Sequence, residues 1–174
     1  MEEKTCPEFI FSNVNNWLKH AEQKNAYLFS AFSFMSLITV ILNNLNKITI
    51  TLKISTIITI VLYIFSLFVT LISLYPVTNI SKKILEKGKN KKTTPNDNLL
   101  FYEDISKYSL NEYVQRLDEN YSIKIETQLD KDLINQILIN SNITSNKYKC
   151  FKVSSVLLFV AILQFSIFFS ISLF

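Results

Sequence analysis

The fold is decided by stretches such as VSSVLLFVAILQFSIFFSISLF, residues 153–174, in which no side chain carries a charge. Two more uncharged stretches occupy residues 25–46 and residues 54–79, and the second of these reads ISTIITIVLYIFSLFVTLISLYPVTN. A helix rises about 1.5 Å per residue, so roughly 20 residues cross the ~30 Å hydrocarbon core of a bilayer. Each stretch is long enough for one crossing. The sequence therefore predicts an integral membrane protein and argues against a soluble enzyme.

These stretches predict an all-α integral membrane protein with three transmembrane helices. In chain order we expect a cytoplasmic amphipathic helix over residues 1–25, a transmembrane hairpin over 26–79, a cytoplasmic helical sensor region over 80–152, and a C-terminal transmembrane helix over 153–174. The two spans of the hairpin fall at about residues 26–42 and 54–74, with the connector 43–53 between them. Because this connector is short, both ends of the hairpin are expected on the same side of the membrane.

Lysines set the predicted orientation. Six of them crowd one stretch just after the second span: Lys82, Lys83, Lys87, Lys89, Lys91 and Lys92. Positive charge close to a span end is retained in the cytoplasm. We therefore expect a multi-pass protein of the cell inner membrane whose N-terminus and residues 80–152 are cytoplasmic. The cluster also suits anionic lipids, and since it has no interleaved aromatic residues or arginines, no nucleic-acid partner is expected.

The N-terminal region is expected to form an amphipathic helix that runs straight into the first span. Pro7 suits the start of a helix, and Ser12 or Asn13 are candidate N-caps. An apolar stripe at helical spacing follows and consists of Val14, Trp17, Leu18 and Ala21. Such a stripe is typical of a helix that packs on one side.

The region between the second and third spans is expected to be helical after a linker. Residues 88–97, GKNKKTTPND, predict a flexible linker, and residues 98–119 predict one or two helices, the second capped by Ser109 or Asn111. An apolar and aromatic face is formed by Leu99, Leu100, Tyr102, Ile105, Tyr108, Tyr113 and Leu117.

From about Gln128 to Phe174 the chain contains no proline or glycine, which predicts one long helix entering the membrane near Val153. Its cytoplasmic apolar pattern is formed by Leu129, Leu133, Ile134, Ile137, Leu138, Ser141 and Tyr148.

Little in the sequence supports catalysis or metal binding. Gly88 is the only glycine, so a P-loop, a GxGxxG turn and a GxSxG elbow are excluded. His20 is the only histidine, and Cys6 and Cys150 are isolated, without the spacing of a metal site. We therefore expect no catalytic residue, no metal, no cofactor and no enzymatic activity. Arg116 is the only arginine, and its planar fork suits either a phosphate ligand or a local ion pair.

Short motifs flank the predicted spans in a recognisable order. HAEQKNAYL, residues 20–28, leads into the first span. NLLFYEDI at 98–105, LNEY at 110–113, DKDLINQILINSNI at 130–143 and KY at 147–148 precede the last span. In this order the motifs resemble the transmembrane effector family of the bacterial Pycsar anti-phage systems. The arrangement of hairpin, cytoplasmic helices and final span is also similar, so the resemblance covers nearly the whole chain.

The resemblance implies a gene beside a pyrimidine cyclase that makes cyclic UMP or cyclic CMP during infection. The effector would respond by impairing the inner membrane, so that the cell dies by abortive infection before phage is released. The expected partners are therefore the membrane, a cyclic mononucleotide second messenger as activating ligand, and further copies of the chain in a homo-oligomer. The candidate ligand-binding residues are Lys24, Asp104, Arg116, Asn140, Ser141 and Lys147.

Two other functions stay open at this point. A constitutive holin-like membrane toxin needs no small-molecule trigger, and its expression alone would depolarise cells. A non-enzymatic adaptor subunit of a membrane complex would need a partner for stability and would be harmless when expressed alone, with or without the nucleotide.

Overall fold

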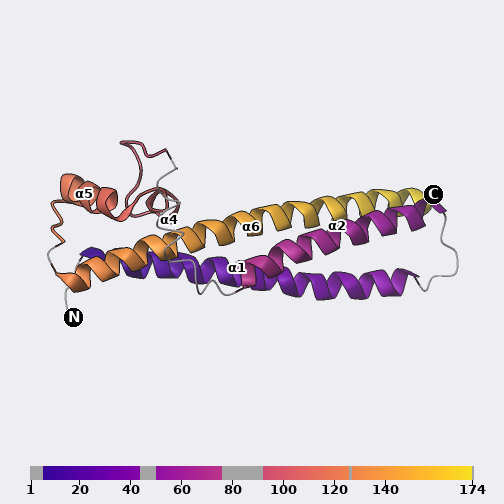
Figure 1. The fold of residues 1–174 in the computed structure, drawn as a ribbon. Coiled ribbons are helices and arrows are strands. Elements are labelled where there is room, and N and C mark those ends of the chain that lie inside the picture. The colour runs from indigo at the N-terminus through magenta and orange to yellow at the C-terminus, as the bar shows by residue number, and fades with distance from the viewer. Residues whose placement is uncertain (1–5, 44–49, 76–91, 126, 174) are drawn as a thin grey trace. The chain divides into compact units, whose positions relative to one another are not determined.

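The computed structural model describes residues 6–43, 50–75, 92–125 and 127–173, and most of them are helical (Figure 1). In chain order the helices are α1 (Cys6–Asn43), α2 (Ile50–Leu74), α4 (Tyr102–Ile105), α5 (Leu110–Tyr121) and α6 (Gln128–Leu173). No strand occurs among the described residues. The predicted all-α class is therefore confirmed for this part of the chain.

The helices belong to two compact units. The first unit comprises Met1–Ala21 and Pro76–Lys147, and the second comprises Glu22–Tyr75 and Tyr148–Phe174. Helices α1 and α6 contribute residues to both units. The long helix predicted from the absence of proline and glycine after Gln128 is confirmed as α6.

Two helices begin earlier than the sequence patterns predicted. Helix α1 begins at Cys6, so neither Ser12 nor Asn13 caps it, and Pro7 lies in its first turn, where the missing N–H of proline has no intrahelical acceptor to lose. Helix α2 begins at Ile50, inside the predicted connector, so Lys53 lies in its first turn. A charge marks the edge of an uncharged stretch, but it does not interrupt backbone hydrogen bonds. The helix is therefore longer than the apolar run.

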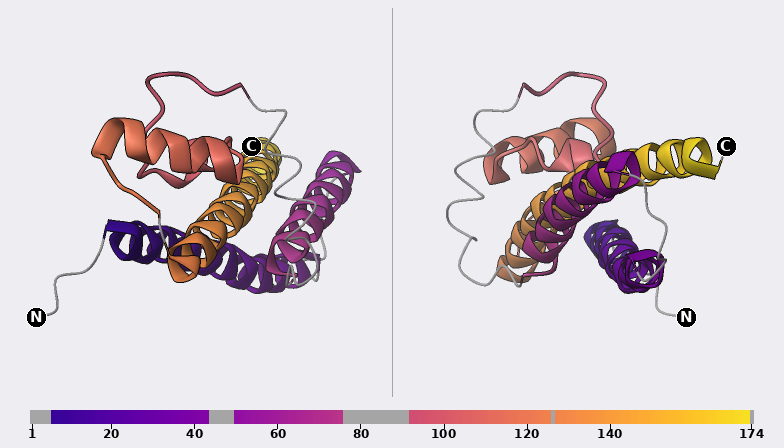
Figure 2. Two further views of the ribbon diagram at one scale, coloured as in Figure 1. Left: turned by 60° about the vertical axis from the view of Figure 1, so that its left-hand side comes forward. Right: turned by 90° about the vertical axis from the view of Figure 1, so that its right-hand side faces the viewer.

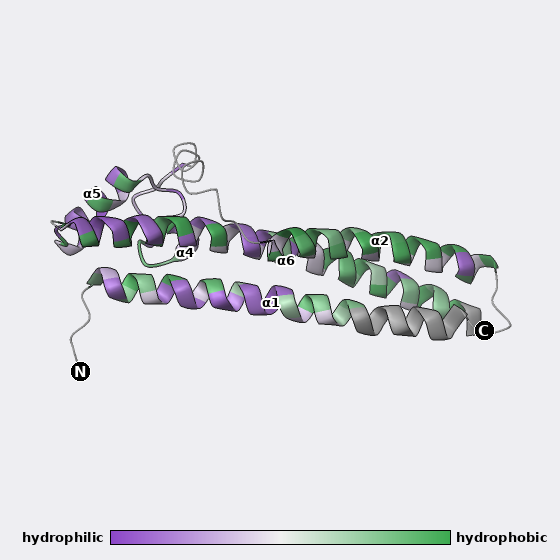
Figure 3. Cartoon of the chain, turned by 60° about the horizontal axis from the view of Figure 1, so that its bottom comes forward, coloured by the Kyte–Doolittle hydropathy of each residue, from purple (hydrophilic) through white to green (hydrophobic). Residues whose placement is uncertain are grey.

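Two described helices are long and apolar enough to cross a membrane, Ile50–Leu74 and Gln128–Ile171. Figure 3 shows the hydrophobic colour along α2 and along the later part of α6. The predicted first span, residues 26–42, falls largely on side chains outside the described part of the chain, because these are described only up to Phe32 in this helix. Its membrane crossing stays a prediction.

The polarity of α2 is the reverse of that in a helix of a water-soluble protein. Its buried residues are all hydroxyl side chains, namely Ser55, Thr59, Ser66, Thr70 and Ser73. Its exposed side chains include Ile57, Ile58, Val61, Ile64, Phe65 and Phe68. A helix surrounded by water buries its apolar face, whereas hydrocarbon favours apolar side chains outside and polar groups satisfied within the protein. The pattern of α2 therefore fits a lipid environment.

The hydrophobic core of the first unit joins the beginnings of α1 and α6 to α5 and the segment before it (Figures 1 and 2). Its buried members are Ile10, Val14, Leu99, Ile105, Tyr108, Tyr113, Leu117, Ile134, Ile137 and Leu138. Most positions of the two predicted cytoplasmic faces are thus confirmed as core. Leu129 is an exception, since it is exposed in the first turn of α6. Helix α6 begins at Gln128, one residue before Leu129.

Aromatic side chains close this core on one side. The Trp17 ring of α1 packs against Phe101 and Tyr102, with ring centroids 5.9 Å and 5.6 Å apart. Tyr113 of α5 is fully buried, and its hydroxyl donates to the Leu99 carbonyl oxygen at 2.7 Å. This bond connects α5 to the chain that precedes α4. Burial raises the pKa of the Tyr113 hydroxyl well above its usual range, so it remains a donor.

Replacing Tyr113 by phenylalanine should destabilise the first unit. The substitution keeps the ring but leaves the Leu99 carbonyl without its donor, and such a loss costs about 1–3 kcal/mol when the group is buried. Thermal unfolding of the full chain in detergent, followed by circular dichroism, would show a lower midpoint. The matched control is Tyr121→Phe, at an exposed tyrosine of the same helix. Equal midpoints for the two variants would contradict the role assigned to this bond.

Candidate functional site

A pocket of about 330 Å³ opens in the first unit beside α5. Its lining comes from the segment before α4, from the turn before α5 and from one face of α5: Thr93, Thr94, Pro95, Tyr108, Glu112, Gln115 and Arg116. The volume lies at the lower end of the range of roughly 300–1,000 Å³ that is typical of small-molecule sites. The pocket is therefore the candidate functional site of the first unit.

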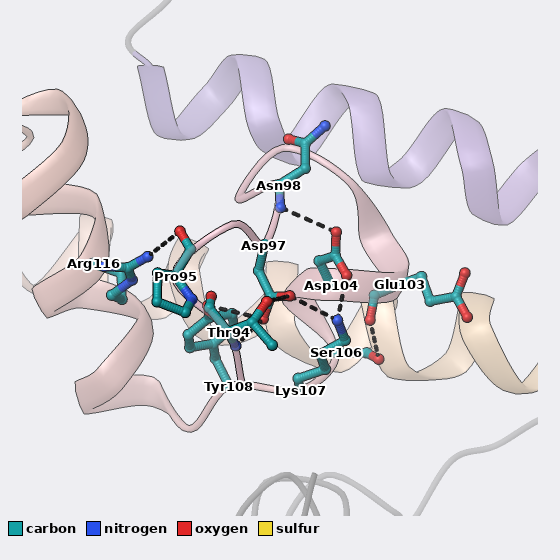
Figure 4. A network of polar contacts seen from close by, with 10 residues as sticks. All are labelled: Thr94, Pro95, Asp97, Asn98, Glu103, Asp104, Ser106, Lys107, Tyr108 and Arg116. Atoms are coloured by element: carbon teal, nitrogen blue, oxygen red, sulfur yellow. Dashed lines mark hydrogen bonds and ion pairs between the residues drawn. The ribbon is translucent and has the colours of Figure 1, made fainter. Parts of the chain in front are cut away.

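One wall of the pocket is held in place by Asp97. Its carboxylate accepts the backbone N–H of Thr94 at 3.0 Å and the Thr94 hydroxyl at 2.7 Å. It also accepts the Tyr108 hydroxyl at 3.1 Å and the Lys107 ammonium at 2.9 Å (Figure 4). These contacts fix residues 94–97 against the turn that precedes α5. The described part of the predicted flexible linker is thus tied to the core, contrary to expectation.

The charges of this network are matched internally. Burial by itself raises the pKa of the Asp97 carboxyl, but the hydrogen bonds from Lys107, Thr94 and Tyr108 outweigh it, and the pKa lies well below its usual range. Hydrogen bonds to Asp104 and Asp97 raise the pKa of Lys107. Asp104, a predicted ligand residue, also accepts the backbone N–H of Asn98 at 3.0 Å. Asp104 and Lys107 therefore hold the loop together.

Arg116 is the predicted candidate that the structure places in the pocket. Its Nη2 donates to the Pro95 carbonyl oxygen at 2.9 Å (Figure 4). Its Nη1 pairs with Glu119 at 3.4 Å. The local ion pair left open by the sequence is therefore present. The Tyr108 hydroxyl is a further hydrogen-bond partner of the Arg116 side chain. A guanidinium has five N–H donors, which exceeds these three contacts. Capacity for a further acceptor remains.

Helix α5 presents Arg116 because its first turn is well defined. Ser109 is the N-cap, as predicted, and its backbone N–H and hydroxyl donate to the Glu112 carboxylate at 3.0 Å and 2.6 Å. This is the carboxylate half of a capping box. Glu112 thus fixes the start of α5, and it lines the pocket together with Arg116.

Asn140, Ser141 and Lys147 do not line the pocket. The Asn140 amide of α6 donates to the Asn15 side chain of α1 at 2.8 Å. The Ser141 side chain is fully buried, and its hydroxyl has no hydrogen-bond partner among the described residues. Lys147 is half-buried at the last position of the first unit. These three predicted candidates therefore lie along α6 and do not line the pocket with Arg116.

Lys24, the remaining candidate, belongs to the second unit. Its ammonium lies 5.1 Å from the ring centroid of Tyr148 and 5.7 Å from that of Phe151. Such cation–π contacts contribute about 0.5–1 kcal/mol at exposed positions. Within the second unit, Lys24 thus links α1 to α6.

A second polar feature lies between α2 and α6 in the second unit. We call it the hydroxyl seam, formed by Ser55, Thr59, Ser66 and Thr70 of α2 with Ser154 and Gln164 of α6. The Ser66 Oγ lies 2.7 Å from the Ser154 carbonyl oxygen, and the Ser154 Oγ lies 2.7 Å from the Ser66 carbonyl oxygen. Thr70 Oγ1 is 2.6 Å from Ser154 Oγ. The two helices thus exchange side-chain and backbone hydrogen bonds at one level.

A second level of the hydroxyl seam is made by Gln164. Its amide nitrogen donates to the Ser55 hydroxyl at 2.7 Å, and its amide oxygen accepts the Thr59 hydroxyl at 3.0 Å. Small hydroxyl residues permit close helix approach and supply hydrogen bonds where water is absent. The serine and threonine side chains of α2 and α6 supply such hydrogen bonds here.

The loop held by Asp97 should respond to pH through its carboxylate. A lowered pKa in the folded state gives a stabilisation that is present above about pH 4, the unfolded value, and lost as pH falls further. Because the pKa of Lys107 is raised in the folded state, the stabilisation of the loop by its ammonium is retained up to about pH 10. Hydrogen exchange of the Asp97 amide, corrected for intrinsic rate, should therefore stay slow from pH 5 to 9 and accelerate in acid.

The variant Asp97→Asn isolates this charge. At neutral pH we expect roughly tenfold faster exchange at residue 97, because hydrogen bonds to a charged group contribute about 1.5–3 kcal/mol. Asp118→Asn is the control, at an exposed carboxylate of α5. If both variants exchange like the unmodified chain, Asp97 does not hold the loop.

The hydroxyl seam should stabilise the pairing of α2 with α6. Ser154→Ala removes the shared hydroxyl and Gln164→Leu removes the amide, and each should lower the free energy of unfolding in detergent or bicelles by about 0.6–1.7 kcal/mol. Ser166→Ala is the control, because the Ser166 hydroxyl donates only to the Ile162 carbonyl of its own helix. A loss as large for Ser166→Ala would show that the seam makes no specific contribution.

A family model described as a Pycsar effector protein domain matches residues 8–174. This range contains every described residue of the pocket and of the hydroxyl seam. No curated protein and no solved structure matches the chain.

Proposed function

Because the chain belongs to the Pycsar effector family, it is an anti-phage defence effector, and we propose that it responds to a cyclic pyrimidine nucleotide by impairing the inner membrane. The observation that carries the membrane part of the proposal is the reversed polarity of α2. This helix buries its hydroxyl groups and exposes its large apolar side chains. In water, that exposure would cost about 25 cal/mol for each Å² of apolar surface. In lipid it costs nothing, which supports a multi-pass membrane protein.

The proposed orientation places the N-terminus and residues 80–152 in the cytoplasm. It rests on the lysine cluster after the second span, which apart from Lys92 lies outside the described residues. A nucleotide made in the cytoplasm would then meet the first unit, where the pocket is. This supports the pocket as the part that senses the signal, and the second unit as the part that acts on the membrane.

The damage itself is proposed to come from assembly of several copies, without enzymatic chemistry. The hydroxyl seam supports this step, because serine, threonine and glutamine side chains that join α2 to α6 within one copy can form equivalent hydrogen bonds between copies. A ligand that binds one arrangement of the chain more tightly shifts the population toward that arrangement. Membrane impairment then follows from the new helix contacts, and no covalent step is required.

The test is the membrane potential of cells that express the chain with and without a uridylate or cytidylate cyclase. We expect depolarisation only when an active cyclase is present, and none with a cyclase whose catalytic site has been inactivated. The difference between the two cyclases would identify the activating nucleotide.

The other outcomes separate the alternatives. Depolarisation without any cyclase would identify a constitutive holin-like toxin and refute the response to a nucleotide. A stable potential under every condition would refute membrane impairment by this chain alone and favour an adaptor subunit.

A further inference from the structure

We propose that the pocket beside Arg116 binds a single cyclic mononucleotide, with the Arg116 guanidinium as the ligand of its phosphodiester. The inference deepens the proposed function, on which it rests for the identity of the nucleotide. The site itself is argued below from charge, donor geometry and size.

The pocket offers a ligand one cation. Among its seven lining residues Arg116 is the only cation, and Glu112, whose carboxylate accepts the Ser109 N–H and hydroxyl, is the only anion. A cyclic phosphodiester carries one negative charge, whereas a nucleoside triphosphate carries several that a single guanidinium leaves uncompensated and that the Glu112 charge repels. A cyclic nucleotide is therefore better matched to the site than its precursor.

The Arg116 guanidinium is prepared for a phosphate. Its contacts with the Pro95 carbonyl oxygen and with Glu119 hold the side chain at the edge of the pocket. The side chain keeps a relative exposure of 26%, so its remaining N–H donors are accessible. The planar fork matches two phosphate oxygens with parallel hydrogen bonds. A side chain that is already ordered loses less conformational freedom when it binds.

The rest of the pocket suits a nucleoside. The Thr93 hydroxyl is exposed and has no partner among the described residues. The Gln115 amide nitrogen donates to Glu119 at 2.8 Å, which leaves its amide oxygen for a ligand donor. Tyr108 is only 3% exposed, so it closes the pocket floor and does not offer its ring for stacking. With about 330 Å³, the space suits one mononucleotide better than a dinucleotide.

Binding at Arg116 also reaches the loop. The same guanidinium that would receive the phosphate bonds the Pro95 carbonyl and thereby ties residues 93–97 to α5. A phosphate at the remaining N–H donors compensates the guanidinium charge and so weakens the contacts that Arg116 makes with Glu119 and Pro95. Occupation of the pocket and the hold on the loop are therefore energetically linked, as differential binding to two states requires.

The experiment is equilibrium binding of radiolabelled 3′,5′-cyclic UMP and 3′,5′-cyclic CMP to the full chain in detergent or nanodiscs. Arg116→Gln should weaken binding at least tenfold, since a hydrogen bond to a charged group contributes about 1.5–3 kcal/mol. Arg116→Lys should fall between, because an ammonium keeps the charge but loses the fork. Lys131→Gln is the matched control, with the same charge change at an exposed lysine of the first unit.

Two further measurements sharpen the test. UTP should compete poorly with the cyclic nucleotide, because its extra charges face a single guanidinium. Glu119→Gln should tighten binding by roughly two- to fivefold, because it removes the carboxylate that competes for Arg116 in an exposed ion pair. Glu119→Gln also tests the proposal if circular dichroism shows that Arg116→Gln does not fold. Unchanged nucleotide binding by Glu119→Gln would then refute Arg116 as the ligand of the phosphodiester.

The outcomes distinguish the site from the function. If Arg116→Gln binds as tightly as the unmodified chain, the pocket is refuted, and the nucleotide response stands. If the chain binds neither cyclic nucleotide while cells still depolarise with an active cyclase, the site is refuted and the effector function survives. If the chain neither binds a nucleotide nor depolarises cells, both proposals fail.

Discussion

Polar groups in a hydrocarbon environment must find their partners within the protein, and the described spans of this chain depend on that constraint. It requires helices, since a helix satisfies its own backbone. It also explains why the hydroxyl side chains of α2 lie inside, opposite Ser154 and Gln164 of α6. The exposed side chains of α2 include large apolar ones such as Ile57, Phe65 and Phe68. The core of the first unit is apolar instead, with Tyr113, Leu117 and Ile137 inside. The buried face of α2 and the core of the first unit thus differ in polarity.

Sequence periodicity was sufficient for the helices and for most of the first core. The faces through residues 99–117 and 133–138 are buried as predicted. The hydroxyl seam was missed because each serine or threonine was judged alone. Its signal was present in the spacing of positions 55, 59, 66, 70 and 73, which repeats on one helix face. Its partners Ser154 and Gln164 lie 84 to 109 residues later, and no local pattern connects them.

The pocket was only partly predictable. Arg116 stood out as the sole arginine, but the wall opposite it was read as a flexible linker from its polar composition. That wall is ordered by Asp97, whose partners Lys107 and Tyr108 lie beyond α4. Residues such as Asn140 and Ser141 were chosen from motifs and from polarity beside a span. In the structure they lie on α6, where Asn140 bonds Asn15 and Ser141 is buried. Composition identifies a binding group, whereas tertiary contacts decide which groups meet.

The energetics of a single pocket bear on how the proposed effector would be switched. One guanidinium–phosphate contact worth about 1.5–3 kcal/mol distinguishes two states of the chain by roughly ten- to a hundredfold. Moving a population from 1:99 to 99:1 requires about 10⁴-fold. One occupied pocket therefore does not complete the transition. When two or more copies change together, their preferences multiply. Two copies that each prefer one state by about a hundredfold reach about 10⁴-fold together. The homo-oligomer proposed above would supply such copies.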